Sequence, residues 1–176
     1  VLSTEYYLDL AGTMMKEMII RDRHHPSVLA WGIGDEFESS SPDSRGFVES
    51  LVRLAKSLDN RATYYGSRMF TNDVCIEFVD IAAVNLQAQD TKIFKRQLED
   101  WKRSNPSKPV IVAKFGAEVQ HDNHNGYSDP LSYEAQARFY IQRLDVIRTL
   151  DYDGAFVLSF SDWKGDRPSL TVHSGD

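Results

Sequence analysis

Apolar residues along the chain follow two spacings that alternate with each other. Four segments carry apolar residues at every third or fourth position, which predicts amphipathic helices. These helices are expected at residues 7–24, 43–58, 91–103 and 132–150, with a shorter one at 72–78. Between them lie short apolar runs that are typical of strands buried on both faces, at 27–34, 62–65, 81–86, 110–113 and 154–160. Strands that alternate with helices predict a parallel sheet covered by helices, which is the α/β class.

The same spacing predicts which face of each helix lies in the core. For the helix at 91–103, the inward residues are expected to be Ile93, Phe94, Leu98 and Trp101. For the helix at 132–150, they are expected to be Tyr133, Ala137, Ile141, Leu144, Ile147 and Leu150. Each set forms a stripe that is wide enough to pack a helix against a sheet.

Length and composition are those of an ordinary globular domain. The 176 residues favour a single domain, and no linker or internal repeat divides them. The formal net charge of −6 argues against nucleic acid or an anionic membrane surface as the main partner. No apolar run approaches the roughly 18 residues that span a bilayer. Cys75 is the only cysteine, which excludes an intrachain disulfide, and the chain opens on Val1, so we expect an excerpt of a longer protein.

The stretch HHPSVLAWGIGDE, residues 24–36, joins a helix to a buried strand and ends on two carboxylates. Pro26 ends the helix, because proline disfavours helical backbone at the residue before it. The strand at 27–34 is followed directly by Asp35 and Glu36. In parallel α/β folds the carboxyl ends of the strands are where ligands bind and chemistry takes place. Asp35 and Glu36 are therefore the first candidates for a functional site.

This stretch resembles the acid/base strand of the family 2 glycoside hydrolases, the β-galactosidase and β-glucuronidase group. The run HPSV, Trp31, Gly34 and Glu36 match that family's motif. Three later segments follow in the family's order: VDIAAVN resembles its sixth strand, KPVIVAKFG its seventh, and GAFVLSFSDW its eighth. The resemblance therefore covers nearly the whole chain.

The resemblance implies an eight-stranded (β/α)8 TIM barrel, of which this chain supplies about strands four to eight. Residues 1–176 then form a single partial barrel domain, and the first three strands lie outside this chain. A five-stranded piece exposes two sheet edges and the apolar inner layer, which is an aggregation hazard unless they are covered. We expect the missing N-terminal barrel region, a partner chain or another copy to cover them.

The resemblance also assigns the two catalytic positions. Retaining glycosidases use one carboxylic acid as acid/base and a second carboxylate, about 5–5.5 Å away, as nucleophile. Glu36 matches the acid/base residue, whereas Lys114 occupies the nucleophile's position at the end of the seventh strand. An ammonium group cannot form the glycosyl ester, and it repels the positive charge that develops at the anomeric carbon. The substitution therefore predicts that catalysis is lost or impaired.

Other positions of the expected sugar site are either changed or kept. The family's asparagine before the acid/base residue is Asp35 here, and the tryptophan beneath the sugar aligns with Leu158. An aromatic residue of the family aligns with Gln87, whereas an asparagine of the sixth strand is retained. By resemblance, the residues expected to contact a sugar are Asp35, Asn85, Asp162 and Trp163. Trp163 fits a cap on the core equally well.

Two alternative chemistries remain open. Glu118, four residues after Lys114, and Asp162, at the end of the last strand, are the other carboxylates that could replace the nucleophile. The two histidines of HDNH, residues 121–124, could ligate zinc together with the aspartate between them. A polar loop over 117–131 explains these histidines without a metal, and we expect neither a metal ion nor a cofactor.

Two functional hypotheses follow. The first is a non-catalytic barrel of glycosidase ancestry that binds carbohydrate or takes part in the assembly of a larger protein. The second is an active retaining β-glycosidase that hydrolyses O-glycosyl bonds with an unorthodox nucleophile. Lys114 distinguishes them, because only the second requires a carboxylate that the motif does not place.

Overall fold

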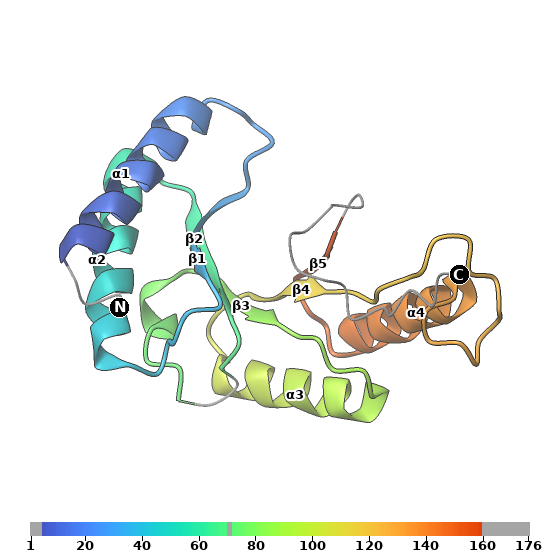
Figure 1. Ribbon diagram of the computed structural model, residues 1–176. Helices are drawn as coiled ribbons and strands as arrows, with labels where there is room; N and C mark the ends of the chain where they lie inside the picture. Colours follow the sequence, from blue (N-terminus) through green and yellow to red (C-terminus); the bar gives the residue numbers. More distant parts are fainter. Residues whose placement is uncertain (1–4, 70–71, 160–176) are drawn as a thin grey trace.

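The fold is a parallel sheet with helices packed along one face (Figure 1). The structure, a computed structural model, describes residues 5–69 and 72–159. Its helices are α1 (Glu5–Asp22), α2 (Pro42–Leu58), α3 (Thr91–Ser104) and α4 (Tyr133–Thr149), with the 3-10 turn η1 (Ile76–Phe78). Its strands are β1 (Ala30–Asp35), β2 (Ala62–Ser67), β3 (Ala82–Asn85), β4 (Val110–Phe115) and β5 (Gly154–Val157).

The strands lie in the sheet in the order in which they occur in the chain. The order is β1-β2-β3-β4-β5, and every neighbouring pair is parallel. Each connection contains a helix or a helical turn, as parallel pairs require a crossover. The predicted parallel α/β sheet of five strands is therefore confirmed.

Two apolar clusters pack between the sheet and its helices. The first joins α1 and α2 to β1 and β2, and among its members are Ile19, Trp31, Leu51 and Tyr65. The second joins α3 and α4 to β3 and β4, and among its members are Val84, Phe94, Trp101 and Val112. Successive residues of a strand point to opposite faces, so Gly32, Gly34 and Ala83 lie on the inner face, away from the helices. The inner face therefore carries small side chains at these positions.

Two strands carry an extra residue near their carboxyl ends. In β1 it lies between Gly32 and Asp35, and in β4 it lies after Val112, where the register shifts against both β3 and β5. Such bulges bend a strand and re-aim its side chains, and they are frequent next to functional sites. They occur here at the edge where the sequence predicts the site.

The predicted inner face of α4 is wrong in three positions, because Ala137, Ile141 and Leu144 are all exposed. Ile141 and Leu144 are 70% and 48% exposed, whereas Phe139, Arg143 and Ile147 are buried. Arg143 lies in the core because its guanidinium stacks between two phenylalanine rings and donates to the carbonyl groups of the β3–α3 loop. The buried face of α4 therefore includes a charged residue and is rotated by part of a helical turn from the predicted face. On α3, Ile93 is also exposed rather than buried.

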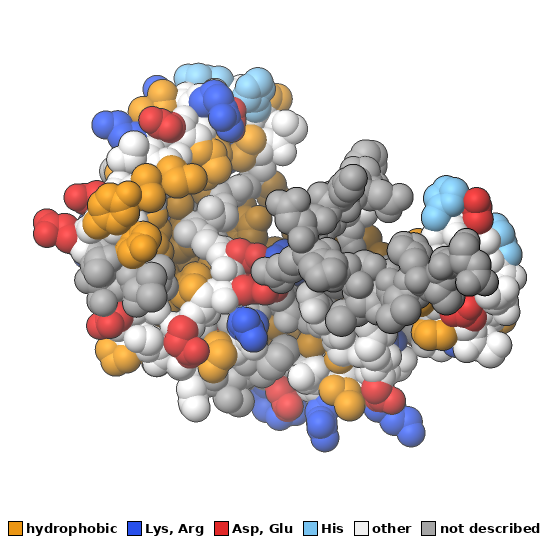
Figure 2. All heavy atoms as spheres, viewed as in Figure 1, with side chains coloured by type: hydrophobic (Ala, Val, Ile, Leu, Met, Phe, Trp, Pro, Cys, Tyr) orange, Lys and Arg blue, Asp and Glu red, His pale blue; other side chains and the backbone are white. Residues whose placement is uncertain are grey.

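Apolar side chains are exposed at both ends of the sheet. Next to β1, helix α1 exposes Tyr6, Leu10 and Met14, and Figure 2 shows hydrophobic side chains gathered over this part of the molecule. At the other end, Phe156 and Val157 of β5 are about half exposed. Of the helices in the described ranges, none is long and apolar enough to cross a membrane.

Candidate active site

The candidate site is built from residues at the carboxyl ends of three strands. Asp35 ends β1 and Glu36 follows it, Asn85 ends β3, and Lys114 is the penultimate residue of β4. In a flat sheet, β1 and β4 would lie about 14 Å apart, because three strand spacings separate them. The Lys114 ammonium nevertheless donates to Asp35 Oδ2, and its Nζ lies 3.6 Å from Glu36 Oε1. The structure thus brings four sequence-predicted residues into one cluster, which we call the lysine cluster: Asp35, Glu36, Asn85 and Lys114.

Asn85 joins the two carboxylates from within the sheet. Its Nδ2 donates to Asp35 Oδ1 at 2.8 Å and to Glu36 Oε1 at 2.9 Å. The residue is only 6% exposed, and its Oδ1 is buried without a hydrogen-bond partner among the residues that the structure describes. The amide therefore acts as a fixed donor that holds both carboxylates at the strand ends.

Glu36 has an unusual backbone conformation. Its φ of 52° places it in the left-handed region, and its N–H donates to the carbonyl of Gly66 at 2.9 Å. Positive φ is uncommon for residues other than glycine, and such conformations cluster at functional sites. The turn of the backbone at Glu36 directs its side chain over the end of the sheet toward Asn85.

Gly66 is a site residue that the sequence-based prediction missed. A Cβ at this position would lie 2.3 Å from Asp35 Oδ1 and 2.7 Å from Asn85 Oδ1. Asn85 on β3 can therefore reach Asp35 on β1 only because the strand between them has no side chain at this point. An isolated glycine within a strand, as in ATYYGS, indicates close approach of another group, and that was the available signal.

The charge of Lys114 is stabilised by its surroundings. The hydrogen bond to Asp35 holds the pKa of the Lys114 ammonium above its ordinary value, and the charges of Asp35 and Glu36 act in the same direction. Partial burial opposes this shift of the pKa. Lys114 is therefore a cation at neutral pH and has no free lone pair with which to attack a substrate.

The remaining predicted site residues are not part of the lysine cluster as described. Gln87 is exposed, and Leu158, which is 41% exposed, directly follows β5. Glu118 is exposed in the loop after β4, and within the described ranges no hydrogen bond or ion pair joins it to Glu36. Asp162 and Trp163, predicted as sugar contacts, lie outside the described residues.

The two histidines of the loop after β4 pair with different carboxylates. His121 Nδ1 lies 3.1 Å from Asp122 Oδ2, whereas His124 Nδ1 lies 3.5 Å from Glu134 Oε1. In the part of the chain that the structure describes, no three histidine, cysteine or acidic side chains are grouped as metal ligands. The zinc hypothesis therefore gains no support from the loop.

A second polar cluster, the Asp73 hub, lies at the end of β2. Asp73 Oδ1 accepts from the Tyr65 hydroxyl and from the backbone N–H groups of Cys75 and Ile76, at 2.5, 3.0 and 3.1 Å. Its Oδ2 accepts from the hydroxyl groups of Ser39 and Ser67, at 2.9 and 2.6 Å. The hub ties the loop after β1 to the end of β2, and sequence reasoning did not find it.

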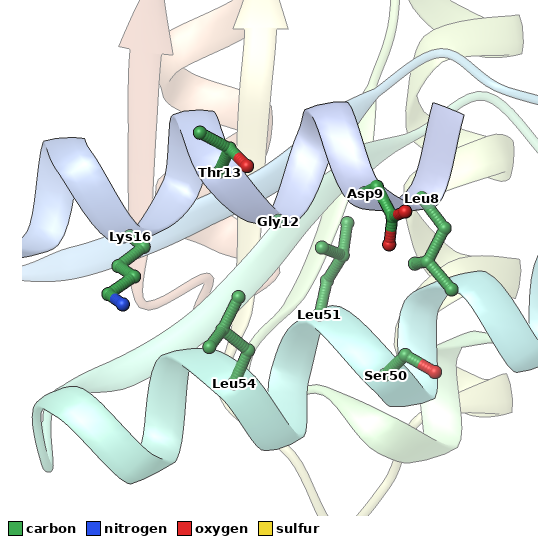
Figure 3. A pocket seen from close by; sticks show the side chains of 8 residues that line it. All are labelled: Leu8, Asp9, Gly12, Thr13, Lys16, Ser50, Leu51 and Leu54. Atoms are coloured by element: carbon green, nitrogen blue, oxygen red, sulfur yellow. The ribbon is translucent and has the colours of Figure 1, made fainter. Parts of the chain in front are cut away.

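A cavity of about 310 Å³ lies between α1 and α2 (Figure 3). Leu51 and Leu54 point from α2 toward α1, where Gly12 leaves space. Asp9 and Lys16 lie at its rim. The cavity is in the helix layer, away from the carboxyl ends of the strands, and it brings no group to the lysine cluster.

Comparison with known proteins identifies the family. The family model of the TIM barrel domain of glycosyl hydrolases family 2 matches residues 4–176. The chain belongs to this family. The predicted relationship and the barrel fold are thereby confirmed, and the five parallel strands form part of a family 2 barrel.

Relatives of this family 2 chain include several β-glucuronidases. The chain is 30% identical over 142 residues to the β-glucuronidase of Streptococcus agalactiae, which covers 72% of this chain and 24% of that protein. It is 24% identical over 175 residues to the β-glucuronidase of Mus musculus, covering 90% of this chain and 27% of that protein. The chain thus spans about a quarter of the length of the curated relatives that it matches.

Solved structures show the same fold at lower identity. A β-glucuronidase from Ruminococcus gnavus in complex with uronic isofagomine superposes with a TM-score of 0.86 at 19% identity. The superposition covers 93% of this chain and 31% of that one. A β-galacturonidase from Eisenbergiella tayi bound to galacturonate gives a TM-score of 0.78 at 20% identity, covering 87% and 29% of the two chains.

Proposed function

We propose that this family 2 barrel has lost or impaired glycosidase catalysis and acts in carbohydrate binding or in the assembly of a larger protein. The observation that carries the proposal is the position of the Lys114 ammonium, which contacts both Asp35 and Glu36. Glu36 takes the acid/base position by resemblance, and Lys114 takes that of the nucleophile. The first three barrel strands are supplied from outside residues 1–176, which form one partial domain.

The chemistry of a retaining glycosidase conflicts with this arrangement at two steps. The nucleophile must add a carboxylate oxygen to the anomeric carbon, and an ammonium held in its charged form cannot do so. The transition state also develops positive charge beside the nucleophile, where Lys114 places a like charge. Both effects raise the activation free energy of glycosyl transfer. Neither effect prevents a sugar from binding at the rim.

The second candidate function is an active retaining β-glycosidase that uses another carboxylate. Asp35 supports this alternative, because Asp35 Oδ1 and Glu36 Oε1 accept from the same Asn85 nitrogen and so lie close together. The Asp35 side chain is also 48% exposed. Its Oδ2 is bound by Lys114, however, which withdraws electron density from the carboxylate and makes it a poorer nucleophile.

The names of the relatives supply a ligand class to test. The relatives described above are β-glucuronidases, and one solved neighbour is a β-galacturonidase bound to galacturonate. We therefore propose β-linked uronic acid sugars as the first candidate ligands of the rim, with neutral β-galactosides as the comparison.

The exposed apolar residues support a covering segment at each end of the sheet. Tyr6, Leu10 and Met14 form one stripe on α1, because positions four apart lie on the same side of a helix. Phe156 and Val157 lie at the opposite end. The proposed cover is the missing barrel region of the full-length protein, and a partner chain or a second copy is the alternative.

The test uses the full-length protein with aryl β-glucuronides, β-galacturonides and β-galactosides. We expect no turnover above background, and binding of a uronic acid sugar detectable by calorimetry. Glu36→Gln is the control variant, because it removes the acid and keeps the shape of the side chain. Hydrolysis with net retention that disappears in Glu36→Gln would overturn the proposal in favour of the active glycosidase.

A further inference from the structure

The contacts of Lys114 with its two acidic neighbours are unequal. The ammonium donates a hydrogen bond to Asp35 Oδ2, whereas its distance to Glu36 Oε1 is 3.6 Å. The second oxygen of Asp35 accepts from Asn85 at 2.8 Å. Asp35 is therefore bound on both oxygens, and it is the closer partner of the lysine.

We propose that Asp35 positions Lys114, and that the two residues form one unit in which a carboxylate at position 114 is tolerated only when the carboxylate at position 35 is removed. The inference concerns the same cluster as the proposed function and rests on it only in calling position 114 that of the nucleophile. Asp35 acts here through Lys114 and is a positioning residue.

Charge explains why the two positions depend on each other. Among the residues that the structure describes, Lys114 is the one cation in contact with the two carboxylates that share the Asn85 amide. Replacing it with glutamate would place three carboxylates within reach of a single uncharged donor. Like charges at such short range repel strongly where solvent is partly excluded. Removing the charge of Asp35 at the same time leaves two carboxylates and an additional amide.

Packing explains why Asp35 cannot simply move away from a new carboxylate. Asp35 Oδ1 lies against Gly66, so close that a Cβ there would be 2.3 Å from it. The backbone of β2 blocks the side chain at this point, and Asn85 holds it from the next strand, β3. Rotation out of the cluster would break the hydrogen bond from Asn85 and leave one N–H of that buried amide without its acceptor, which is costly.

The first experiment measures the reactivity of Lys114 in the full-length protein. Competitive acetylation over a range of pH, followed by peptide mass spectrometry, reports the pKa of each lysine. In Asp35→Asn we expect Lys114 to react several-fold faster at a pH below its pKa, because each unit by which a pKa falls raises the unprotonated fraction about tenfold. In Glu36→Gln the increase should be smaller, since Glu36 is the more distant partner.

Lys95 is an internal control in the same digests. It is half exposed on α3, and its rate should be equal in all three proteins. If Glu36→Gln accelerates Lys114 as much as Asp35→Asn does, or if neither variant changes its rate, Asp35 does not position the lysine and the proposal fails.

The second experiment compares thermal unfolding of Lys114→Glu, Asp35→Asn and the double variant. We expect Lys114→Glu to lower the melting temperature by several degrees, and the added Asp35→Asn to recover most of that loss. The charge-reversal control is Lys92→Glu, because Lys92 is exposed in the first turn of α3, where a carboxylate is compatible with the helix dipole.

If Lys114→Glu does not fold, the soluble yields of the single and double variants give the same comparison. A double variant that is no more stable or soluble than Lys114→Glu would refute the coupling. Neither experiment measures hydrolysis, so a failure here leaves the proposed function untouched, and an active enzyme would not by itself contradict the pairing of Asp35 with Lys114.

Discussion

The Asp73 hub and the lysine cluster lie at the same edge of the sheet but are built in opposite ways. Asp73 receives five hydrogen bonds, all from uncharged donors, and among the donors Tyr65 and Cys75 are completely buried. The lysine cluster instead sets two carboxylates against one ammonium and one amide. Its charged side chains are between 28% and 48% exposed.

The difference separates an acid that supports the structure from acids that can meet a ligand. Asp73 is half-buried, and neutral donors saturate both of its oxygens, so removing it leaves those donors without partners. The carboxylates of the lysine cluster are partly exposed and remain in contact with solvent, so a ligand can reach them. Exposed ion pairs also contribute little to stability, which frees their geometry for function.

The largest expected effect is that of Asp73→Ala. Several buried donors would lose their acceptor, and each unmade buried hydrogen bond costs about 1–3 kcal/mol, so we expect a loss of roughly 3–5 kcal/mol in the free energy of unfolding. Denaturant unfolding of the full-length protein measures it. The free energy of unfolding of Asp73→Asn, which keeps one acceptor oxygen, should lie between those of Asp73→Ala and the wild type. An unchanged midpoint in Asp73→Ala would show that the hub is dispensable.

Cys75 reports on the same hub at a single position. Its thiol is completely buried, and desolvation, aided by the charge of Asp73, raises its pKa to about 12. The folded protein should therefore resist thiol reagents at pH 8, and Asp73→Ala should be labelled faster. Equal labelling rates in the two proteins would mean that the loop after β2 stays closed without the hub.

Gly66→Ala is expected to have an intermediate effect and to act on the lysine cluster. The new methyl group would overlap Asp35 Oδ1 and the Asn85 amide, and overpacking of this kind costs about 1–3 kcal/mol. Gly46→Ala is the matched control, because nothing lies within 4 Å of its position on α2. That control should be neutral or stabilising by up to about 1 kcal/mol. Equal unfolding curves for the two variants would contradict the close packing over β2.

The smallest expected effect is the dependence of stability on alkaline pH. The pKa of Lys114 is raised in the folded protein, so its contribution is fully present below the unfolded pKa of about 10.4 and is lost as pH rises through the folded pKa. Lys114→Met should therefore lose less stability than the wild type between pH 9 and pH 11. Thermal unfolding at the two pH values measures this difference, and parallel losses in both proteins would contradict it.

The order of the helices and strands could be predicted from the spacing of apolar residues. Each strand is a short run such as VIVA at 110–113, and each helix has a face that recurs with the helical period. The inner face of α4 could not be predicted in this way, because Arg143 occupies a core position that apolar periodicity assigns to other residues. Its burial depends on two aromatic rings and on loop carbonyls from β3–α3, which local spacing does not encode.

The motif located the candidate residues in the sequence, but it could not predict the contacts between them. Asp35, Glu36 and Asn85 were expected at strand ends, and they lie there. Their meeting depends on Gly66 and on the bulges in β1 and β4, which are properties of the assembled sheet. Asp73 was missed for the same reason, since its donors come from three separate segments. The roles of the cluster in binding a sugar stay predictions.

The agreement between chain order and strand order has a consequence for how this part of the protein assembles. Each strand pairs with the one made just before it, so every new βα unit finds its neighbour already in place as the polypeptide leaves the ribosome. Each parallel pairing still spans a whole crossover, 32 residues from Ala30 to Ala62, so closing it is slower than closing a hairpin. The described sheet can grow strand by strand from β1 to β5 as each crossover is completed.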